Sequence, residues 1–167
     1  MAIGEIMNGC VWYGVRKCAR LCHKKADKGN QYGQWQDTRH AKAFETLKGA
    51  KALAIGKERG IAEPSTDARC AKCHITGFGE PASAFAKTYK AEDGVGCESC
   101  HGPGRHYLKK SIMESQERSN ANGLIIPDKD MCVTCHNEES PSYKPFVLEE
   151  YWAKIEHPRP EEKSGEE

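Results

Sequence analysis

The feature that most constrains this chain is a cysteine motif that occurs three times in regular form. Two cysteines stand three positions apart and a histidine follows at once, as over Cys97–His101. This order is the signature of c-type haem attachment, in which both thiols form thioethers and the adjacent histidine ligates the iron. The residues of the regular motifs are Cys70, Cys73 and His74, then Cys97, Cys100 and His101, then Cys132, Cys135 and His136.

A fourth motif departs from this spacing by one residue. Cys18 and Cys22 have three residues between them, and His23 follows. We expect it to bind a haem as well, so that the chain carries four covalent haem c groups. Pairs of cysteines at similar spacing also occur in zinc sites and in redox-active disulfides. Neither alternative requires a histidine directly after the second cysteine, so the motifs favour haem.

The composition suits a chain that wraps its cofactors. Its 167 residues are 38% hydrophobic, and the mean hydropathy is −0.75, which is little material for a core made of protein alone. We therefore predict a mainly α fold with extensive loops, little or no sheet, and haems that form the core. Residues 1–157 are expected to form a single tetrahaem domain, followed by a polar, flexible tail over 158–167.

Hydrophobic periodicity predicts helices over residues 35–48, 82–90, 105–118 and 147–155, with a frayed helix end and a loop over 49–67. In the first of these helices His40 shares a face with Phe44 and Leu47. Its imidazole would reach an iron while the two neighbours pack on the ring. His40 is therefore predicted to be an axial ligand.

The ligand count leaves one iron short of a histidine. Four irons offer eight axial positions, and the chain has seven histidines. Beside the four motif histidines, the distal candidates are His40, His106 and His157. His106 lies so close after His101 that we expect it to serve a neighbouring haem. One iron is thus five-coordinate, or it takes a ligand from the set Met7, Met113, Met131 and Cys10.

Cys10 is the odd one of nine cysteines. Its three explanations are a buried free thiol, an intermolecular disulfide and an axial thiolate, of which the small buried thiol is the usual state of an unpaired cysteine.

Charge is distributed unevenly along the chain. Residues 1–72 contain 14 Lys or Arg and 7 Asp or Glu, whereas residues 73–167 contain 11 and 17, which gives +7 and −6. This polarity suits docking of a charged redox partner protein, or head-to-tail self-association into an oligomer or filament, and it argues against nucleic acid as a partner. An ordinary solvated surface explains it equally well.

No membrane span is expected, since no stretch approaches the ~18 apolar residues required. The first nine residues are too short, and their apolar run is too poor, for a secretory signal peptide. Covalent haem attachment in prokaryotes nevertheless takes place outside the cytoplasmic membrane. We therefore predict a periplasmic or extracellular protein whose sequence here lacks its signal peptide.

Four stretches together resemble the tetrahaem cytochrome c-554 family. They are Lys17–Lys24, the Trp35-x-x-Thr38-x-His40 pattern with Ala41–Ala43, Cys70–His74 with Gly77–Gly79, and Gly94–Arg105. The likeness covers roughly residues 12–136. It implies that His40 lies opposite His101 on the third haem, His106 opposite His23 on the first, and His157 opposite His136 on the fourth. The second haem, bound by His74, would then be five-coordinate.

Three functions agree with these features. The first is electron transfer through four closely packed haems, three bis-histidine and one five-coordinate, in a carrier rather than an enzyme. The second is a structural role as the subunit of an extracellular cytochrome filament. The third is reduction of a small ligand such as nitric oxide at the open haem, although the sequence supplies no evident acid or base group for that chemistry.

Overall fold

The computed structural model describes residues 11–145 and 147–157 of the chain. Its elements are short, and the longest helix among them, α4 (Ala50–Glu58), spans nine residues. The only β-type pairing within those ranges is an isolated bridge between Trp12 and Phe85. The predicted mainly α fold without a sheet is therefore confirmed. Met7, Cys10 and the tail over 158–167 lie outside the described residues.

The helical elements follow one another at unequal intervals, since some are contiguous and others are separated by long irregular segments. In chain order they are α1 (Val15–Cys18), η2 (Ala19–His23), η3 (Ala26–Lys28), α2 (Gln31–Gln36), η4 (His40–Lys42), α3 (Ala43–Thr46), α4, α5 (Ala68–His74), η5 (Ala82–Ala84), η6 (Ala91–Asp93), α6 (Cys97–His101), η7 (Gly104–His106), α7 (Lys110–Met113), α8 (Gln116–Ala121), α9 (Lys129–Val133) and α10 (Leu148–Trp152).

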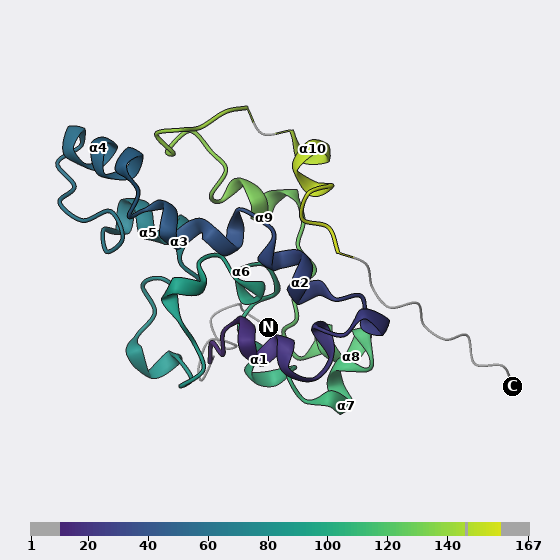
Figure 1. Cartoon of the computed structure of the whole chain (residues 1–167). Helices are drawn as coiled ribbons and strands as arrows, with labels where there is room; N and C mark the ends of the chain where they lie inside the picture. Colours follow the sequence, from purple (N-terminus) through teal and green to yellow (C-terminus); the bar gives the residue numbers. More distant parts are fainter. Residues whose placement is uncertain (1–10, 146, 158–167) are drawn as a thin grey trace, which may run out of the picture.

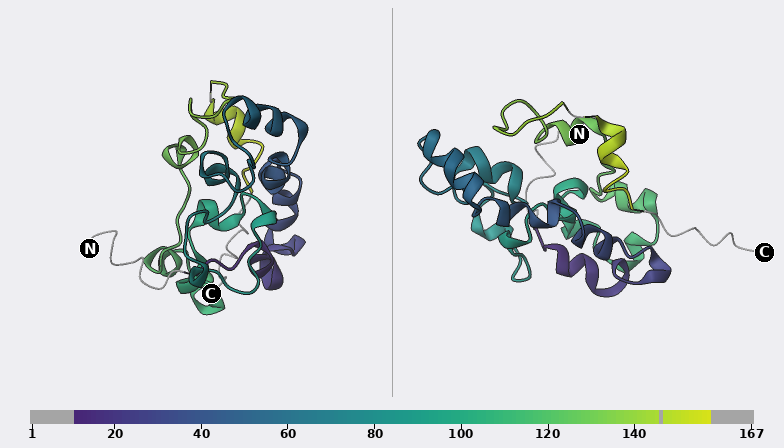
Figure 2. Two further views of the ribbon diagram at one scale, coloured as in Figure 1. Left: turned by 90° about the vertical axis from the view of Figure 1, so that its left-hand side faces the viewer. Right: turned by 45° about the horizontal axis from the view of Figure 1, so that its top comes forward.

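The helices are arranged along an elongated body (Figures 1 and 2). Helix α4 lies at one end, whereas α7 and α8 lie at the other. Helices α3, α5 and α6 occupy the middle, and α9 and α10 lie along one side. Among residues 11–145 and 147–157, no helix is long and apolar enough to span a lipid bilayer.

The core formed by protein atoms is small. Its central cluster consists of Phe44 in α3, Ala71 in α5 and Ile75 directly after α5. Phe78 and Ala91 pack against this cluster. The buried apolar residues in the described part of the chain are Val15, Ala19, Ala43, Phe44, Leu47, Ile61, Pro64, Ala71, Ile75 and Tyr107. This is a thin core for a chain of 167 residues.

The helix predicted over residues 35–48 is interrupted, so that prediction was wrong. Helix α2 ends at Gln36, and η4 and α3 follow after a turn. The carbonyl of His40 accepts a hydrogen bond from the backbone N–H of Val95 at 3.1 Å, and the indole of Trp35 donates to the Val95 carbonyl at 2.9 Å. These contacts with a distant segment replace the regular geometry of one long helix.

The other helix predictions met mixed outcomes. Residues 82–90 contain only the turn η5. Residues 105–118 divide among η7, α7 and α8. The Ser115 hydroxyl caps α8 by accepting a hydrogen bond from the Arg118 N–H at 3.2 Å. Residues 49–67 contain α4, a regular helix where fraying was expected. The helix predicted over 147–155 is confirmed as α10.

Candidate haem-binding site

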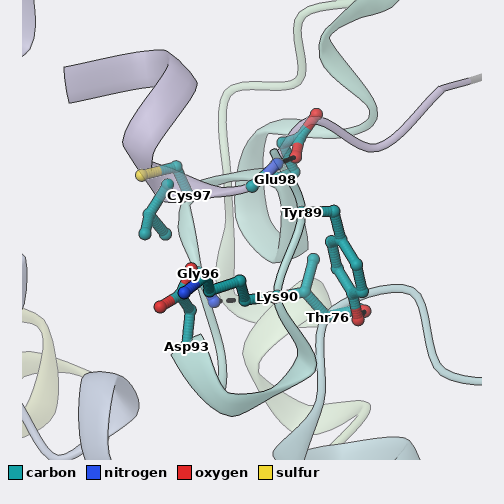
Figure 3. Close-up of a pocket in the computed structure, with 9 residues that line it drawn as sticks. Thr76, Tyr89, Lys90, Asp93, Gly96, Cys97 and Glu98 are labelled. Atoms are coloured by element: carbon teal, nitrogen blue, oxygen red, sulfur yellow. Dashed lines mark hydrogen bonds between the residues drawn. The ribbon is translucent and has the colours of Figure 1, made fainter. Parts of the chain in front are cut away.

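The third motif, on α6, is the most enclosed of the four. Glu98, between its cysteines, is 2% exposed and accepts hydrogen bonds from three backbone N–H groups: Tyr13 at 2.9 Å, Gly14 at 2.7 Å and Gly104 at 2.7 Å. Glu98 therefore ties the segment before α1 and the turn after α6 to the motif. Figure 3 shows Glu98 and Cys97 beside a small cavity of about 10 Å³, which Thr76, Tyr89 and Asp93 also line.

Further contacts hold the residues on both sides of this motif. The Tyr107 hydroxyl is buried and donates to the carbonyls of Gly102 at 2.5 Å and His101 at 3.1 Å. Gly94, before the motif, has φ +70°, and a Cβ there would lie 2.7 Å from the His40 carbonyl oxygen. Only glycine fits both that backbone conformation and that close approach. His40 is thereby brought next to the segment that leads into α6.

Three motif histidines have their Nδ1 atoms held by acceptors. His74 Nδ1 lies 2.7 Å from the Ala43 carbonyl, and His101 Nδ1 lies 2.9 Å from the Ile125 carbonyl. His23 Nδ1 lies 3.2 Å from the side-chain oxygen of Gln31. An oxygen acceptor at Nδ1 places the hydrogen there and leaves Nε2 available as a metal ligand. These three histidines therefore suit axial ligation of haem iron.

Two pairs of histidine rings face each other across short distances. The ring centroids of His40 and His136 are 6.0 Å apart, and those of His101 and His157 are 5.9 Å apart. An imidazole binds a metal at about 2 Å, so two rings on one iron have their nitrogens about 4 Å apart and their centroids about 6 Å apart. Both separations are compatible with two imidazoles that would hold the same iron.

These ring contacts differ from the pairing that the family resemblance implied, which stays a prediction. His40 lies against His136 rather than His101, and His157 lies against His101 rather than His136. The sequence could not reveal these contacts, because His40 is far from His101 and His136 along the chain, and the Val95 hydrogen bond to its carbonyl also joins distant segments.

Burial lowers the pKa of all four paired histidines. For His40 the nearby His136 lowers the pKa further, and for His157 the nearby His101 does so. For His101 the hydrogen bond to Ile125 opposes the effect of burial, and for His136 burial acts alone. A lowered pKa favours the neutral imidazole, which is the form that binds metal.

The eight motif cysteines are all free and half-buried thiols. A hydrogen bond between Cys18 and Cys97 raises the pKa of the first and lowers that of the second, so the first and third motifs are neighbours. A hydrogen bond between Cys73 and Cys135 likewise joins the second and fourth motifs.

The thiol pKa values at the second motif do not fit a redox-active disulfide. Burial raises the pKa of Cys70, and burial together with the nearby Cys135 raises that of Cys73 to about 12. Redox-active pairs lower the pKa of a thiol instead. Within the described residues, no group of three or more His, Cys, Asp or Glu side chains is arranged to hold one metal ion.

The extra residue of the first motif lies in a π-helical turn. The turn η2 spans Ala19–His23 directly after α1. A π-helix closes its hydrogen bonds over five residues instead of four, so one turn contains more residues than an α-helical turn. Cys18 and Cys22 thus remain about one turn apart despite the longer spacing. His23 also lies close enough to His101 and His157 to lower their pKa.

The structure gathers some predicted site residues and leaves others apart. His106 is exposed at the end of η7. His74 lies against α3 through Ala43 and the Thr46 hydroxyl, which is 3.2 Å from its Nδ1. Sequence reasoning missed Gln31 and Glu98, because a glutamine outside any motif carries no signal and a glutamate between motif cysteines looks like a solvated residue.

Comparison with known proteins gives one family and one curated relative. The family model for cytochrome c554 and c-prime matches residues 17–102. Cytochrome c-554 of Nitrosomonas europaea is 34% identical over 161 residues, which cover 81% of this chain and 65% of the relative. The chain thus spans less than two thirds of that protein's length. No solved structure matches it.

Proposed function

Because this chain belongs to the cytochrome c554 and c-prime family, and is thus a c-type cytochrome with covalently bound haem c, we propose that it transfers electrons through four haems. Each haem is attached at one of the four motifs, and residues 1–157 form a single tetrahaem domain. The observation that carries this proposal is that thiols of different motifs contact each other. Attachment sites so close together support a proposal in which the haems lie side by side.

The proposed order of the haems follows these thiol contacts. The thiols of Cys18 and Cys97 are hydrogen-bonded, as are those of Cys73 and Cys135. Cys132 lies close enough to Cys100 to raise the pKa of Cys100. The haems therefore lie in the order first, third, fourth, second. Haem iron supplies one-electron chemistry when bound, and the protein sets its potential through axial ligands and burial.

The proposed ligands combine the motif histidines with the facing rings. His101 and His157 hold the third haem, and His136 and His40 hold the fourth, as supported by the ring separations of 5.9 and 6.0 Å. His23 holds the first haem with His106 as its partner, a pairing that rests on the family resemblance. His74 holds the second haem alone, which makes that iron five-coordinate.

The proposed partners are redox proteins that meet a basic surface beside the first motif. The exposed basic residues from α1 to η3 are Arg16, Lys17, Arg20, Lys24, Lys25 and Lys28. A surface of one charge sign steers an oppositely charged partner into contact and speeds association. We place the protein in the periplasm, because haem c is attached outside the cytoplasmic membrane.

Haem counting and spin-state measurement test this proposal. Mass spectrometry of the purified protein is expected to show four covalent haems, and electron paramagnetic resonance is expected to show three low-spin irons and one high-spin iron. Fewer than four haems would contradict the tetrahaem assignment, and four low-spin irons would contradict the open second haem.

A pair of variants tests the ligand assignment. The double substitution Cys132→Ala and Cys135→Ala removes the fourth haem. Adding His40→Ala to it should leave the remaining low-spin irons unchanged, because the proposed iron of His40 is already gone. If His40 ligates the third haem instead, the added substitution will convert one more iron to high spin. In the otherwise unaltered protein, His40→Ala alone should convert one iron.

A further inference from the structure

The proximal ligand of the first haem is held by a side chain, in contrast to two other motifs. His74 and His101 donate from Nδ1 to backbone carbonyls, whereas the partner of His23 is the amide oxygen of Gln31 at 3.2 Å. Gln31 begins α2 and is 9% exposed. A carbonyl of the main chain cannot be altered by substitution, but this acceptor can.

A second hydrogen bond sets the orientation of the Gln31 amide. Its Nε2 group donates to the Lys28 carbonyl at 2.6 Å, a contact that an amide oxygen could not make. The amide oxygen must therefore face His23, so Nδ1 of His23 carries the hydrogen and Nε2 is left free. The tautomer that a haem ligand requires is thus set before the iron is bound.

We propose that Gln31 is a positioning residue that sets the ligand strength of His23 and thereby the reduction potential of the first haem, an inference that rests on the proposed function of the motif. A stronger acceptor at Nδ1 makes an imidazole a better electron donor to its metal. A better donor stabilises ferric iron and lowers the potential, and a missing acceptor has the opposite effect. The neutral amide of Gln31 therefore keeps the reduction potential of the first haem between these two extremes.

Redox titration of three variants tests this inference, with haem mass and electron paramagnetic resonance measured on each. Gln31→Leu removes the acceptor and should shift one of the haem potentials upward. Gln31→Glu supplies a charged acceptor and should shift the same potential downward. Gln34→Leu is the matched control, since Gln34 lies on the same helix and its Nε2 donates to the Gly29 carbonyl at 2.7 Å. This control should leave all potentials unchanged.

The outcomes separate this inference from the proposed function. Shifts of opposite sign in the two Gln31 variants, with Gln34→Leu unchanged, would support it. Potentials that stay unchanged, that move the same way in both Gln31 variants, or that move equally in Gln34→Leu would overturn it. If mass spectrometry finds no haem on the first motif of the unaltered protein, the proposed function of that motif fails instead.

Discussion

The third and fourth motifs share one sequence pattern but are supported in different ways. The third is tied to residues far away in the chain, since Glu98 between its cysteines accepts from Tyr13 and Gly14. The fourth is supported by near neighbours: the Asp128 carboxylate caps α9 by accepting from the Met131 N–H at 3.0 Å, and Asn137 donates to the Val133 carbonyl at 3.0 Å. The same sequence pattern is therefore held by two different kinds of contact.

The largest expected effect is that of removing the Glu98 carboxylate. Glu98→Ala leaves three backbone N–H groups without their acceptor in the interior, so we expect a loss of about 3 kcal/mol or more in the free energy of unfolding. Denaturant unfolding followed by absorbance and circular dichroism measures it. The exposed Glu138, beside the fourth motif, provides the control substitution Glu138→Ala. Equal losses in the two variants would remove the contrast between the motifs.

Acidification is expected to weaken both regions. Burial lowers the folded pKa of His40, His101, His136 and His157, so these rings stay neutral in the folded protein while the unfolded chain takes up protons below its ordinary pKa of about 6.5. The stability that they contribute is complete above that pH and is lost as the pH falls through the folded pKa. Denaturant unfolding between about pH 8 and pH 5 should show the decline. A free energy of unfolding that stays constant across this range would contradict the prediction.

A smaller effect is expected from the cap of α9. Asp128→Ala removes the side chain that accepts from the Met131 N–H and should cost about 1 kcal/mol. Asp130→Ala is the matched control within the same helix, because Asp130 is exposed and does not occupy the cap position. Hydrogen exchange should show faster opening of α9 in the first variant and no change in α6. Faster exchange in both helices would mean that the two motifs unfold together.

The smallest effect is expected where the second and fourth motifs meet at the surface. Lys72 and Glu139 form an ion pair at 2.5 Å, and their side chains are 49% and 71% exposed. Water screens such a pair, so Lys72→Ala should change the free energy of unfolding by about 0.5 kcal/mol or less. A measured loss well above this value would show that the pair joins the two motifs more strongly than its exposure indicates.

Local sequence was a fair guide to helix formation but a poor guide to helix length. The helix over 147–155 was predicted and found, because its apolar face and its ends are local features. The helix over 35–48 was predicted as one piece and is divided between Gln36 and His40, where the Trp35 indole and the His40 carbonyl both bond to Val95 in another part of the chain. Short helices are marginal by themselves, so such contacts decide where they end.

The sequence by itself supplied the four cysteine motifs proposed to attach haem, the histidine adjacent to each, and a total of seven histidines for the eight axial positions that four haems would offer. These conclusions rest on residues that are neighbours in the chain, and such residues are close together in space whatever the fold. Tertiary structure alone decided that His40 faces His136 and His157 faces His101. It also placed Gln31 on His23 and buried Glu98. These contacts join distant segments, and their partners depend on how the whole chain packs.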